Sequence, residues 1–379
     1  MKLIYLIAGV YRSAGMERVL SLKASALRSA GHEVVIVTTE QRGQEPVFNL
    51  GEFRRIDLGI NYELTSGAGF LRKAISHPFK QLRHFRRLSA TLQQEKADIV
   101  VSMFDGDAPL TWKIKDGSRK VLEVHFSHFK KLQYGRKGIW ALADKWRTMM
   151  DVLTASHYDK FVVLTKEDKK YWEEDYRRFG LKNNIVCIPN PRTFTPGDFP
   201  ALAKKKMVLA AGRYTYQKGF DILVEAWAKI AGEFPDWELR IAGDGEDGDA
   251  LRALAGKSGA SGSIILGKDN DIKALYSQAA LYAMTSRYEG LPMVLLEAQA
   301  AGLPIVSVKC KCGPLDVVRG GIDGLLVNEG DTDAFAAALK ELINDEELRK
   351  NMGRAALENS ERFSEPVIMQ KWADLFSSL

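Results

Sequence analysis

The residues best suited to chemistry stand in one run, Glu289 to Ala298, which reads EGLPMVLLEA. Pro292 suits the first position of a helix, because the N–H that proline lacks would have no partner there. The loop before it should therefore direct backbone amides outward at a helix start, where they bind phosphate. Glu297 falls about two turns further along at 3.6 residues per turn. Its carboxylate only accepts hydrogen bonds, which suits the hydroxyls of a ribose, and Glu289 would meet what the phosphate carries.

A second interpretation of this run needs no ligand. A helix buried on its apolar side, with Glu289 in a solvated loop and Glu297 as a surface charge, fits the same residues, because acidic residues are common at helix starts. The loop GRYTYQKG favours the first interpretation, since it places Arg213 and Lys218 five residues apart after an apolar strand. Two cations facing a helix start suit a diphosphate.

Length and composition predict a two-domain protein of the cytoplasm. A chain of 379 residues exceeds what one core usually organises. No apolar run approaches the roughly 18 to 20 residues that span a bilayer, and the first ten residues do not resemble a secretory signal. The three cysteines, Cys187, Cys310 and Cys312, lack a disulfide framework, and no further ligands stand near the last two, so no metal site is expected.

Charge is divided unevenly along the chain. Residues 1–190 carry 32 Lys and Arg against 21 Asp and Glu, a net of +11, while the remainder has 22 against 27, a net of −5. The first half is therefore expected to meet something anionic, such as phospholipid, a lipid-linked phosphate or nucleic acid.

The first half reads as alternating strands and helices. KLIYLIAGV and HEVVIVTTE are predicted strands around an amphipathic helix that ends near Gly31. No G-x-G-x-x-G follows the first strand, so no dinucleotide is expected here. Residues 13–15, Ser-Ala-Gly, form a small-residue turn that would let a ligand approach the backbone, although a plain tight turn fits equally well. His125 and His128 follow a predicted strand, RKVLEVHFSHF, where α/β folds collect ligands.

Residues 70–92 interleave aromatic or aliphatic residues with basic ones, which is typical of an interfacial amphipathic segment. Pro78 should limit it to a helix after that point or to a kinked one. A solvated surface helix fits equally well. No RNA-binding or helix-turn-helix signature accompanies the segment, so nucleic acid is not expected. The members of the pattern are Phe70, Leu71, Arg72, Lys73, Phe79, Lys80, Leu82, Arg83, Phe85, Arg86, Arg87 and Leu88.

A proline-rich stretch, NIVCIPNPRTFTPGD, predicts an extended linker and a domain boundary near residue 190. Beyond it the strand and helix alternation restarts and places LYAMTS directly before Glu289. At the end of the chain, Ile368, Trp372 and Phe376 line one helix face at four-residue steps, and this face needs a partner surface.

With these residues in place, the chain resembles glycosyltransferase family 4, the retaining, nucleotide-sugar-dependent transferases. The match covers nearly all of the chain and is most specific from Gly212 to Val327, where GRYTYQKGFDILVEA, IAGDG, LGKDNDI, SRYEGLPMVLLEAQAAGLPIVS, CGPLDVV and GIDGLLV stand in the family's order. The resemblance implies an α/β GT-B fold, two Rossmann-like domains facing across a cleft, with the last helix returning to the first domain. We expect residues 1–190 plus about 364–379 to bind acceptor, and residues 191–363 to bind the nucleotide sugar.

The resemblance also implies roles for individual residues. Arg213 and Lys218 would bind the donor diphosphate, Glu297 the ribose, and Glu289 would lie by the transferred sugar, with Gly290, Leu291, Pro292 and Met293 lending amides. Lys268 and Ile272 would lie near the base. His125 matches a strand-end histidine that contacts the donor sugar, whereas His128 has no such counterpart. Gly15 matches the second glycine of the family's GG turn, and Ala14 replaces the first.

The expected activity is that of a metal-independent, hexosyl-type glycosyltransferase without a cofactor. It would move a sugar from a nucleotide diphosphate, expected to be UDP, to an anionic or lipid-linked glycan acceptor in surface polysaccharide assembly. The expected place is the cytoplasm, with the inner face of the membrane as an option. The alternatives are a soluble sugar or sugar-phosphate acceptor, a non-catalytic nucleotide-sugar binder and, with poorer motif spacing, an epimerase acting on the nucleotide sugar.

Overall fold

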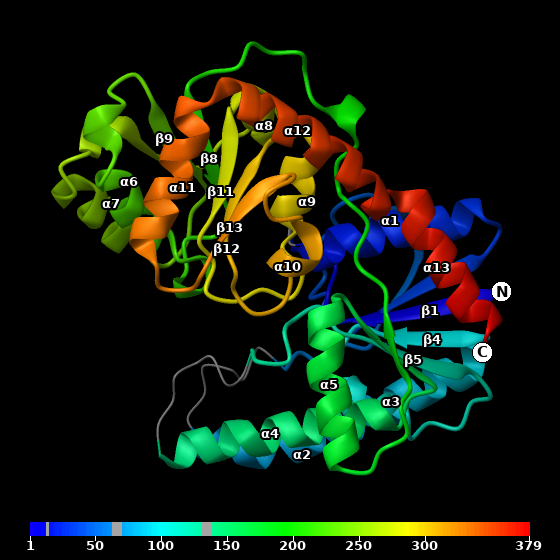
Figure 1. Cartoon of the computed structure of the whole chain (residues 1–379). Coiled ribbons are helices and arrows are strands. Elements are labelled where there is room, and N and C mark those ends of the chain that lie inside the picture. Colours follow the sequence, from blue (N-terminus) through cyan, green and yellow to red (C-terminus); the bar gives the residue numbers. More distant parts are fainter. Residues whose placement is uncertain (13–14, 63–69, 131–137) are drawn as a thin grey trace. The chain divides into compact units, whose positions relative to one another are not determined.

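The computed structural model describes residues 1–12, 15–62, 70–130 and 138–379, without the side chains of residues 70–76 and 139. The chain divides into two compact units (Figure 1). Unit 1 comprises Met1–Pro191 together with Ile368–Leu379, and unit 2 comprises Arg192–Val367. Each unit is an α/β structure built on one parallel sheet.

Unit 1 holds a seven-stranded sheet in the order β3-β2-β1-β4-β5-β6-β7, and every neighbouring pair is parallel. The strands β1, β2, β4 and β6 are apolar runs buried on both faces, as the helices on the two sides of a parallel sheet require. The strands are β1 (Lys2–Ile7), β2 (Glu33–Thr38), β3 (Arg54–Asp57), β4 (Ile99–Ser102), β5 (Arg119–Glu123), β6 (Lys160–Val163) and β7 (Ile185–Cys187).

The helices of unit 1 confirm the predicted alternation but correct it at three points. The helices are α1 (Gly15–Ser29), η1 (Leu50–Glu52), α2 (Phe70–Glu95), α3 (Ala108–Thr111), α4 (Ile139–Ser156) and α5 (Lys166–Arg178). The α2 helix continues through Pro78, so the expectation of a helix only after that residue is wrong, while the alternative of a kinked helix stays a prediction. The strand β3 was not predicted, because RRID is mostly polar and exposed. The first residues of the expected linker form β7 instead, which pairs with β6.

Unit 2 repeats this arrangement with six strands in the order β10-β9-β8-β11-β12-β13. The strands are β8 (Met207–Ala211), β9 (Glu238–Ala242), β10 (Ile264–Gly267), β11 (Leu281–Met284), β12 (Ile305–Val308) and β13 (Gly324–Val327). The helices are η4 (Pro196–Asp198), η5 (Tyr216–Lys218), α6 (Phe220–Ala228), η6 (Ala231–Glu233), α7 (Gly248–Lys257), η7 (Ser261–Ser263), α8 (Ile272–Gln278), α9 (Met293–Ala300), α10 (Pro314–Val317), α11 (Thr332–Asn344), α12 (Glu346–Ser360) and η8 (Glu361–Phe363). Both units thus share the 3-2-1-4-5-6 order of a Rossmann-type sheet.

The last helix, α13 (Glu365–Ser377), serves unit 1. Its Ile368, Trp372 and Phe376 are 0%, 1% and 3% exposed, within the same core as Leu3 and Tyr5 of β1. Figure 1 shows α13 beside the unit 1 elements that carry this core. The prediction that this apolar face needs a partner surface is therefore confirmed. Within the described part of the chain, no helix combines the length and apolar character needed to cross a membrane.

Candidate active site

In unit 2 the loops that follow β8 and β11 leave the sheet next to each other, because these two strands are neighbours. The strand order reverses between them, and ligands of open α/β sheets bind at such a reversal. The first loop carries Arg213 and Lys218, and the second carries Glu289 and the start of α9. The structure therefore brings two separate predicted motifs to one end of the sheet.

Glycines set how closely these loops pack. Gly219, which caps α6 at φ 61°, would place a Cβ atom 2.2 Å from the carbonyl oxygen of Thr285. Gly313, at φ 118°, would place one 2.4 Å from Cδ of Pro292. A side chain at Gly219 would push apart the loops that carry Lys218 and Glu289, and one at Gly313 would displace the start of α9.

Lys218 and Glu289 form the central ion pair of this site. Nζ of Lys218 donates to Oε1 of Glu289 at 2.7 Å, although the two residues are 71 positions apart. Glu289 is only 6% exposed, whereas the Lys218 side chain is 20% exposed. The pair is thus partly desolvated, and its ammonium group still reaches solvent.

Arg213 lies one residue past Gly212, whose absent side chain leaves room for the Lys218 methylenes. The Arg213 side chain is exposed and makes no ion pair or hydrogen bond with any residue that the structure describes. Its guanidinium group is therefore available to an anion beside Lys218.

The α9 helix begins one residue later than predicted. Pro292 has φ −73° and ψ 95°, so it is the N-cap, and Met293 is the first helical residue. The extended ψ angle explains the difference, because a first helical residue would need a helical ψ. No side chain caps this helix start, which fits an anion site. Gly290 is half-buried and Leu291 is buried beside it.

Glu297 is held by the protein itself. Its Oε1 accepts from the Thr193 hydroxyl at 2.6 Å, and its Oε2 accepts from the Tyr276 hydroxyl at 3.0 Å. The side chain belongs to a residue only 9% exposed. The predicted ribose contact would therefore be made by a carboxylate that the protein already orients.

The residues predicted near the base lie after β10. Nζ of Lys268 is 2.7 Å from Oδ2 of Asp244, and both side chains are largely exposed. Ile272 begins α8 and is half-buried, and Asp271 caps that helix by accepting from the Ala274 amide. Within the described ranges, no hydrogen bond or ion pair joins Lys268 to the Lys218 and Glu289 pair.

In unit 1, His125 lies two residues past β5 with a side chain 8% exposed. Its Nε2 is 3.3 Å from Oε1 of Glu123. His128 has a structural role, because its Nε2 lies 2.7 Å from Asp175 and its ring packs edge-on against Trp172. Gly15 begins α1, where an added Cβ would meet nothing within 4 Å, and the preceding Ser13 and Ala14 lie outside the described residues.

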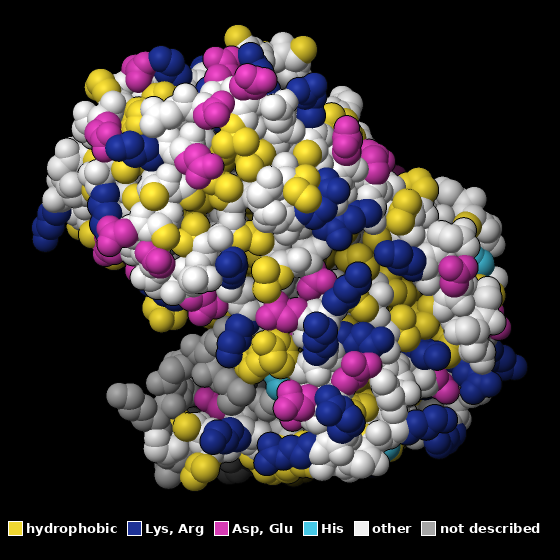
Figure 2. All heavy atoms as spheres, viewed as in Figure 1, with side chains coloured by type: hydrophobic (Ala, Val, Ile, Leu, Met, Phe, Trp, Pro, Cys, Tyr) yellow, Lys and Arg dark blue, Asp and Glu magenta, His cyan; other side chains and the backbone are white. Residues whose placement is uncertain are grey.

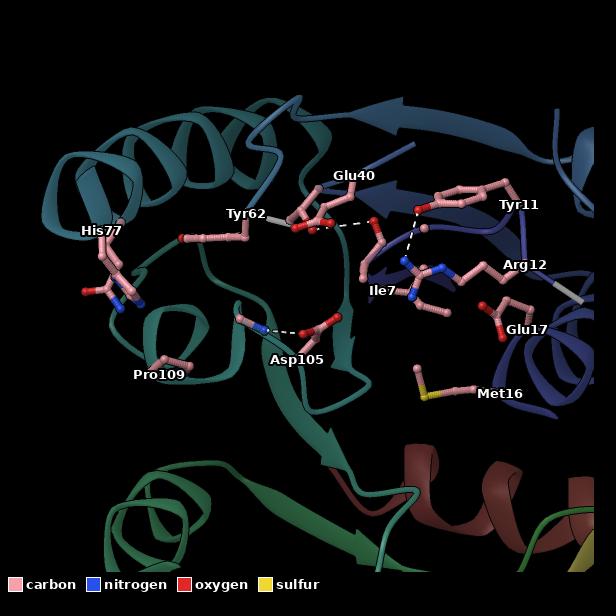
Figure 3. A pocket seen from close by; sticks show the side chains of 15 residues that line it. Ile7, Tyr11, Arg12, Met16, Glu17, Glu40, Tyr62, His77, Asp105 and Pro109 are labelled. Atoms are coloured by element: carbon pink, nitrogen blue, oxygen red, sulfur yellow. Dashed lines mark hydrogen bonds between the residues drawn. The ribbon is translucent and has the colours of Figure 1, made fainter. Parts of the chain in front are cut away.

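Unit 1 also contains a cavity of about 570 Å³ that the sequence did not predict (Figure 3). It lies at the carboxyl ends of β1, β2 and β4, where the strand order of this sheet reverses. Its walls come from the loops after these strands, from the start of α1 and from α2. The lining residues labelled in Figure 3 are Ile7, Tyr11, Arg12, Met16, Glu17, Glu40, Tyr62, His77, Asp105 and Pro109.

This cavity is predominantly acidic. The carboxylates of Glu17, Glu40 and Asp105 border it together with one guanidinium group, that of Arg12 (Figure 3). Burial, together with the negative charges of Asp107, Glu40 and Asp105, raises the pKa of Tyr62 to about 12. A lining of carboxylates and a neutral phenol suits hydroxyl donors. The rule that ligands gather at the carboxyl ends of strands could have located this cavity from the sequence.

Two family models match the chain. Residues 13–192 match the model described as "Glycosyltransferase Family 4", and residues 192–359 match the one described as "Glycosyl transferases group 1". Across the described residues, no group of three or more His, Cys, Asp or Glu side chains could hold a metal ion.

Curated relatives span both units. An uncharacterized glycosyltransferase of Haemophilus influenzae is 28% identical over 372 residues, covering 98% of each chain. The amylovoran biosynthesis glycosyltransferase AmsD of Erwinia amylovora is 36% identical over 58% of this chain and 62% of its own length. A Campylobacter jejuni protein, named GalNAc-alpha-(1->4)-GalNAc-alpha-(1->3)-diNAcBac-PP-undecaprenol alpha-1,4-N-acetyl-D-galactosaminyltransferase, is 26% identical over 100% of this chain and 99% of that one.

Solved structures share the fold at low identity. TarM superposes with a TM-score of 0.80 at 16% identity, covering 99% of this chain and 98% of that one. HepE of Anabaena, solved in complex with UDP, gives 0.78 at 18% identity over the whole of both chains. These likenesses establish a two-domain fold of the GT-B type.

Proposed function

The chain belongs to glycosyltransferase family 4, and from that premise we propose that it is a retaining transferase that moves a sugar from a nucleotide diphosphate to a lipid-linked glycan. The observation that carries the proposal is the Lys218 to Glu289 ion pair beside the uncapped start of α9. We propose UDP as the carrier, since HepE was solved with UDP. The acceptor is suggested by the undecaprenol-linked saccharide in the name of the Campylobacter relative.

The proposed chemistry follows from where charge develops. Breaking the bond between the anomeric carbon and the diphosphate leaves negative charge on the diphosphate oxygen. The cations of Lys218 and Arg213 and the α9 amides would stabilise this charge from fixed positions. In that complex the ammonium of Lys218 moves from Glu289 to phosphate or bridges both, and Glu289 stays beside the sugar. The acceptor hydroxyl then bonds to the same face of the anomeric carbon as the C–O bond to the diphosphate breaks, and its proton passes to the departing diphosphate oxygen. This arrangement supplies the positive charge without a metal ion.

The test is transfer by a Lys218→Ala variant. We expect its turnover with a UDP-sugar to fall by about 10² to 10³, the cost of removing one group that stabilises transition-state charge. Lys229→Ala is the matched control, because Lys229 is exposed and pairs with the exposed Asp333. Wild-type activity should persist in EDTA. Full activity in the Lys218 variant, or transfer that EDTA abolishes, would contradict the mechanism.

We propose that unit 1 approaches the cytoplasmic face of a membrane through α4. In this helix the usual burial pattern is reversed. The polar side chains of Asp144 and Thr148 are buried, at 3% and 8% exposure. Leu142, Trp146 and Met150 face outward at four-residue steps, with exposures of 66%, 59% and 39%. Exposed aromatic and aliphatic side chains beside basic ones favour a lipid headgroup region.

The α2 helix adds to this surface. α3 contacts both α2 and α4, and α4 lies along the lower margin of unit 1 in Figure 1. Phe79 and Leu82 are 73% and 48% exposed, next to exposed Arg83 and Arg86. Figure 2 shows basic and hydrophobic side chains gathered over this margin. The predicted interfacial pattern also includes Phe70, Leu71, Arg72 and Lys73, whose side chains lie outside the described residues.

Flotation with liposomes tests the membrane proposal. Wild-type protein should float with vesicles that contain anionic lipid, and Leu142→Ser combined with Trp146→Ser should remain at the bottom. Ile322→Ser is a matched control, because Ile322 is an apolar residue of unit 2 with a similar exposure of 54%. Equal flotation of all three proteins, or none with wild type, would count against α4 as the contact. Activity on water-soluble acceptors alone would favour the alternative, soluble acceptor.

The acidic cavity narrows the acceptor chemistry within this proposal. Three carboxylates would repel a phosphate group but would accept hydrogen bonds from sugar hydroxyls. We propose that the neutral, hydroxyl-bearing end of the acceptor enters this cavity, and that any lipid phosphate stays outside it. This favours a glycan over a sugar phosphate as acceptor. Hydrolysis of the donor without acceptor would exclude a purely binding function.

A further inference from the structure

The two loops that carry Lys218 and Glu289 are also joined by a second set of contacts, centred on Arg287 of the loop after β11. The Arg287 guanidinium donates to both carboxylate oxygens of Asp221, from Nη1 to Oδ1 at 2.9 Å and from Nη2 to Oδ2 at 2.5 Å. Nη1 also donates to the Tyr216 carbonyl at 2.8 Å. One side chain thus ties η5 and the first turn of α6 to the loop that leads to Glu289.

Backbone contacts beside this side chain join the same two loops. The Arg287 amide donates to the Gln217 carbonyl at 2.8 Å, and Nε2 of Gln217 donates to the carbonyl of the residue after Arg287 at 3.0 Å. The Thr285 hydroxyl donates to the Gly219 carbonyl at 2.8 Å. Gln217 and Gly219 are the neighbours of Lys218 on either side, so the loop after β11 holds the chain both before and after this lysine.

The guanidinium group also has an aromatic ring against one face. Its Cζ lies 4.1 Å from the ring centroid of Tyr216. A guanidinium group donates hydrogen bonds within its plane and stacks through its face, so it can serve a carboxylate, a carbonyl and a ring at the same time. A lysine ammonium has no such plane. The contacts therefore require an arginine, and not only a positive charge, at this position.

The ion pair of Arg287 and Asp221 fixes geometry more than it stabilises the fold. The Asp221 side chain is 47% exposed, and ion pairs with that much solvent access usually add little stability. Two parallel hydrogen bonds nevertheless set the orientation of the two groups as well as their distance. Burial alone would raise the pKa of Asp221, but the hydrogen bonds and charge of Arg287 outweigh it and lower this pKa. The carboxylate is therefore ionised at neutral pH.

We propose that Arg287 is a positioning residue for Lys218 and that it acts through Asp221 and the Tyr216 carbonyl. Nζ of Lys218 lies 2.7 Å from Oε1 of Glu289, and the distance between these groups depends on how the two loops are joined. A cation stabilises developing charge best when its position is fixed before the reaction. Arg287 can supply this without touching the donor. The catalytic consequence rests on the proposed function of Lys218, whereas the contacts of Arg287 do not.

The first measurement needs no substrate. Hydrogen exchange over η5 should be about tenfold faster in Arg287→Gln than in wild type, because three hydrogen bonds from a charged group are lost. Arg319→Gln is the matched control, since the Arg319 side chain likewise donates to a carboxylate and a carbonyl, those of Asp323 and Ala355, each at 3.0 Å. This control should leave exchange over η5 unchanged. Unchanged exchange in Arg287→Gln, or equal acceleration in both variants, would overturn the proposal.

Transfer kinetics test the consequence for Lys218. In Arg287→Gln we expect kcat with a UDP-sugar to fall by about 10- to 100-fold and the donor KM to change by about threefold or less, because a displaced Lys218 mainly affects charge that develops in the transition state. Arg287→Lys keeps a cation for Asp221 but loses the fork, so its kcat should lie between these values. Arg319→Gln, assayed below the melting temperature of every variant, should keep the wild-type kcat. A loss of kcat as large in Arg319→Gln would indicate general destabilisation and contradict a positioning role.

Asp221→Asn gives a second route if the Arg287 variants do not fold. It removes the charge that Arg287 binds, and should speed exchange over η5 and lower kcat in the same way. Because the two groups act as a unit, the double variant Arg287→Gln with Asp221→Asn should lose no more activity than the worse of the two single variants. Losses that multiply would show that Arg287 does not act through Asp221. Wild-type protein that transfers no sugar from any donor would instead contradict the proposed function, and the exchange results would still decide whether Arg287 holds the loop.

Discussion

At the scale of single residues, Glu297 shows that a side chain predicted to bind ligand can also accept hydrogen bonds from the protein. Each of its oxygens already accepts one hydroxyl, from Thr193 and from Tyr276. An ionised carboxylate has about four acceptor positions, so these two hydroxyls alone do not exclude a ribose. The hydroxyls that hold the carboxylate are therefore expected to improve its geometry for the donor rather than to replace it.

Glu297→Gln should therefore weaken donor binding more than it slows the reaction. We expect the KM for the UDP-sugar to rise about tenfold and kcat to change less, because the contact lies on the ribose and not at the reacting bond. Calorimetric titration with UDP measures the same loss directly. Tyr276→Phe, which removes one orienting hydroxyl, should give a smaller effect in the same direction. An unchanged UDP affinity in Glu297→Gln would exclude the ribose contact.

A second residue prediction concerns pH and stability. Burial raises the pKa of Asp107 to about 7, and the nearby Asp105 acts in the same direction. Because the folded state then holds a proton that the unfolded state has released, this group destabilises the fold as pH rises from about 4 to 7. Asp107→Asn should remove the penalty. The variant should gain up to roughly 4 kcal/mol of unfolding free energy at pH 8 relative to pH 4.

Denaturant unfolding of Asp107→Asn and wild type at pH 4, 6 and 8 measures this difference. The two stability curves should separate as pH rises and run parallel above pH 8. Asp105→Asn is the control, since its pocket-lining carboxylate is less enclosed and should alter the pH dependence less. Curves that separate toward low pH would contradict the assignment.

The sequence was sufficient to locate the candidate site, but not to predict which of its side chains contact each other. Two glutamates around GLP, downstream of Arg213 and Lys218, indicated the strand ends where the structure places them. The ion pair of Lys218 with Glu289 joins residues 71 positions apart, and Glu297 meets Thr193 across 104 positions. Neither contact leaves a local pattern, because both depend on how the strands are ordered. The acidic cavity lies where the strand-end rule could have placed it, but its lining residues come from loops far apart in the sequence.

At the scale of elements, buried strands were predictable and exposed ones were not. An apolar run such as LYAM predicts a strand that is buried on both faces of the sheet. The strand β3 reads RRID, and it forms at the sheet margin only because β2 offers free backbone groups there. Pro78 was expected either to limit the helix to the residues after it or to kink it, and one helix spans Phe70–Glu95. In β3, pairing with a strand from elsewhere in the chain outweighs local propensity.

Gly219→Ala tests how strictly the loops of unit 2 are packed. The substitution forces a side chain into φ 61° and to within 2.2 Å of the Thr285 carbonyl. The left-handed conformation alone costs about 1 to 2 kcal/mol, and moving the loop adds to it. Because Thr285 stands four residues before Glu289, transfer activity should fall together with the melting temperature.

Gly256→Ala is the matched control for that experiment. Gly256 lies inside α7, where an added Cβ atom meets nothing within 4 Å. Alanine should stabilise the helix by about 0.5 to 1 kcal/mol and leave activity unchanged. Thermal unfolding should therefore show a lower melting temperature for Gly219→Ala and a higher one for Gly256→Ala, and transfer assays should show a loss of activity only in Gly219→Ala. A Gly219 variant as stable and active as wild type would show that the loop can yield without cost.

At the scale of the whole molecule, two compact units imply two separate responses to ligand. A ligand that binds only the native state stabilises it by about 2.7 kcal/mol at a hundredfold excess over its Kd. Because the ligand stabilises only the unit that binds it, a single melting temperature for the whole chain would not report this stabilisation separately. Hydrogen exchange followed peptide by peptide keeps the units apart.

We therefore expect UDP alone to slow amide exchange in unit 2, in the loops after β8 and β11 that carry Lys218 and Glu289. An acceptor saccharide alone should slow exchange in unit 1, in the loops after β1 and β4 that border the acidic cavity. Lys218→Ala should lose the first response and keep the second, because the two sites draw on different sheets. If UDP instead protected the cavity loops of unit 1 in that variant, the donor would have to bind in unit 1. The assignment of donor binding to unit 2 and acceptor binding to unit 1 would then be wrong.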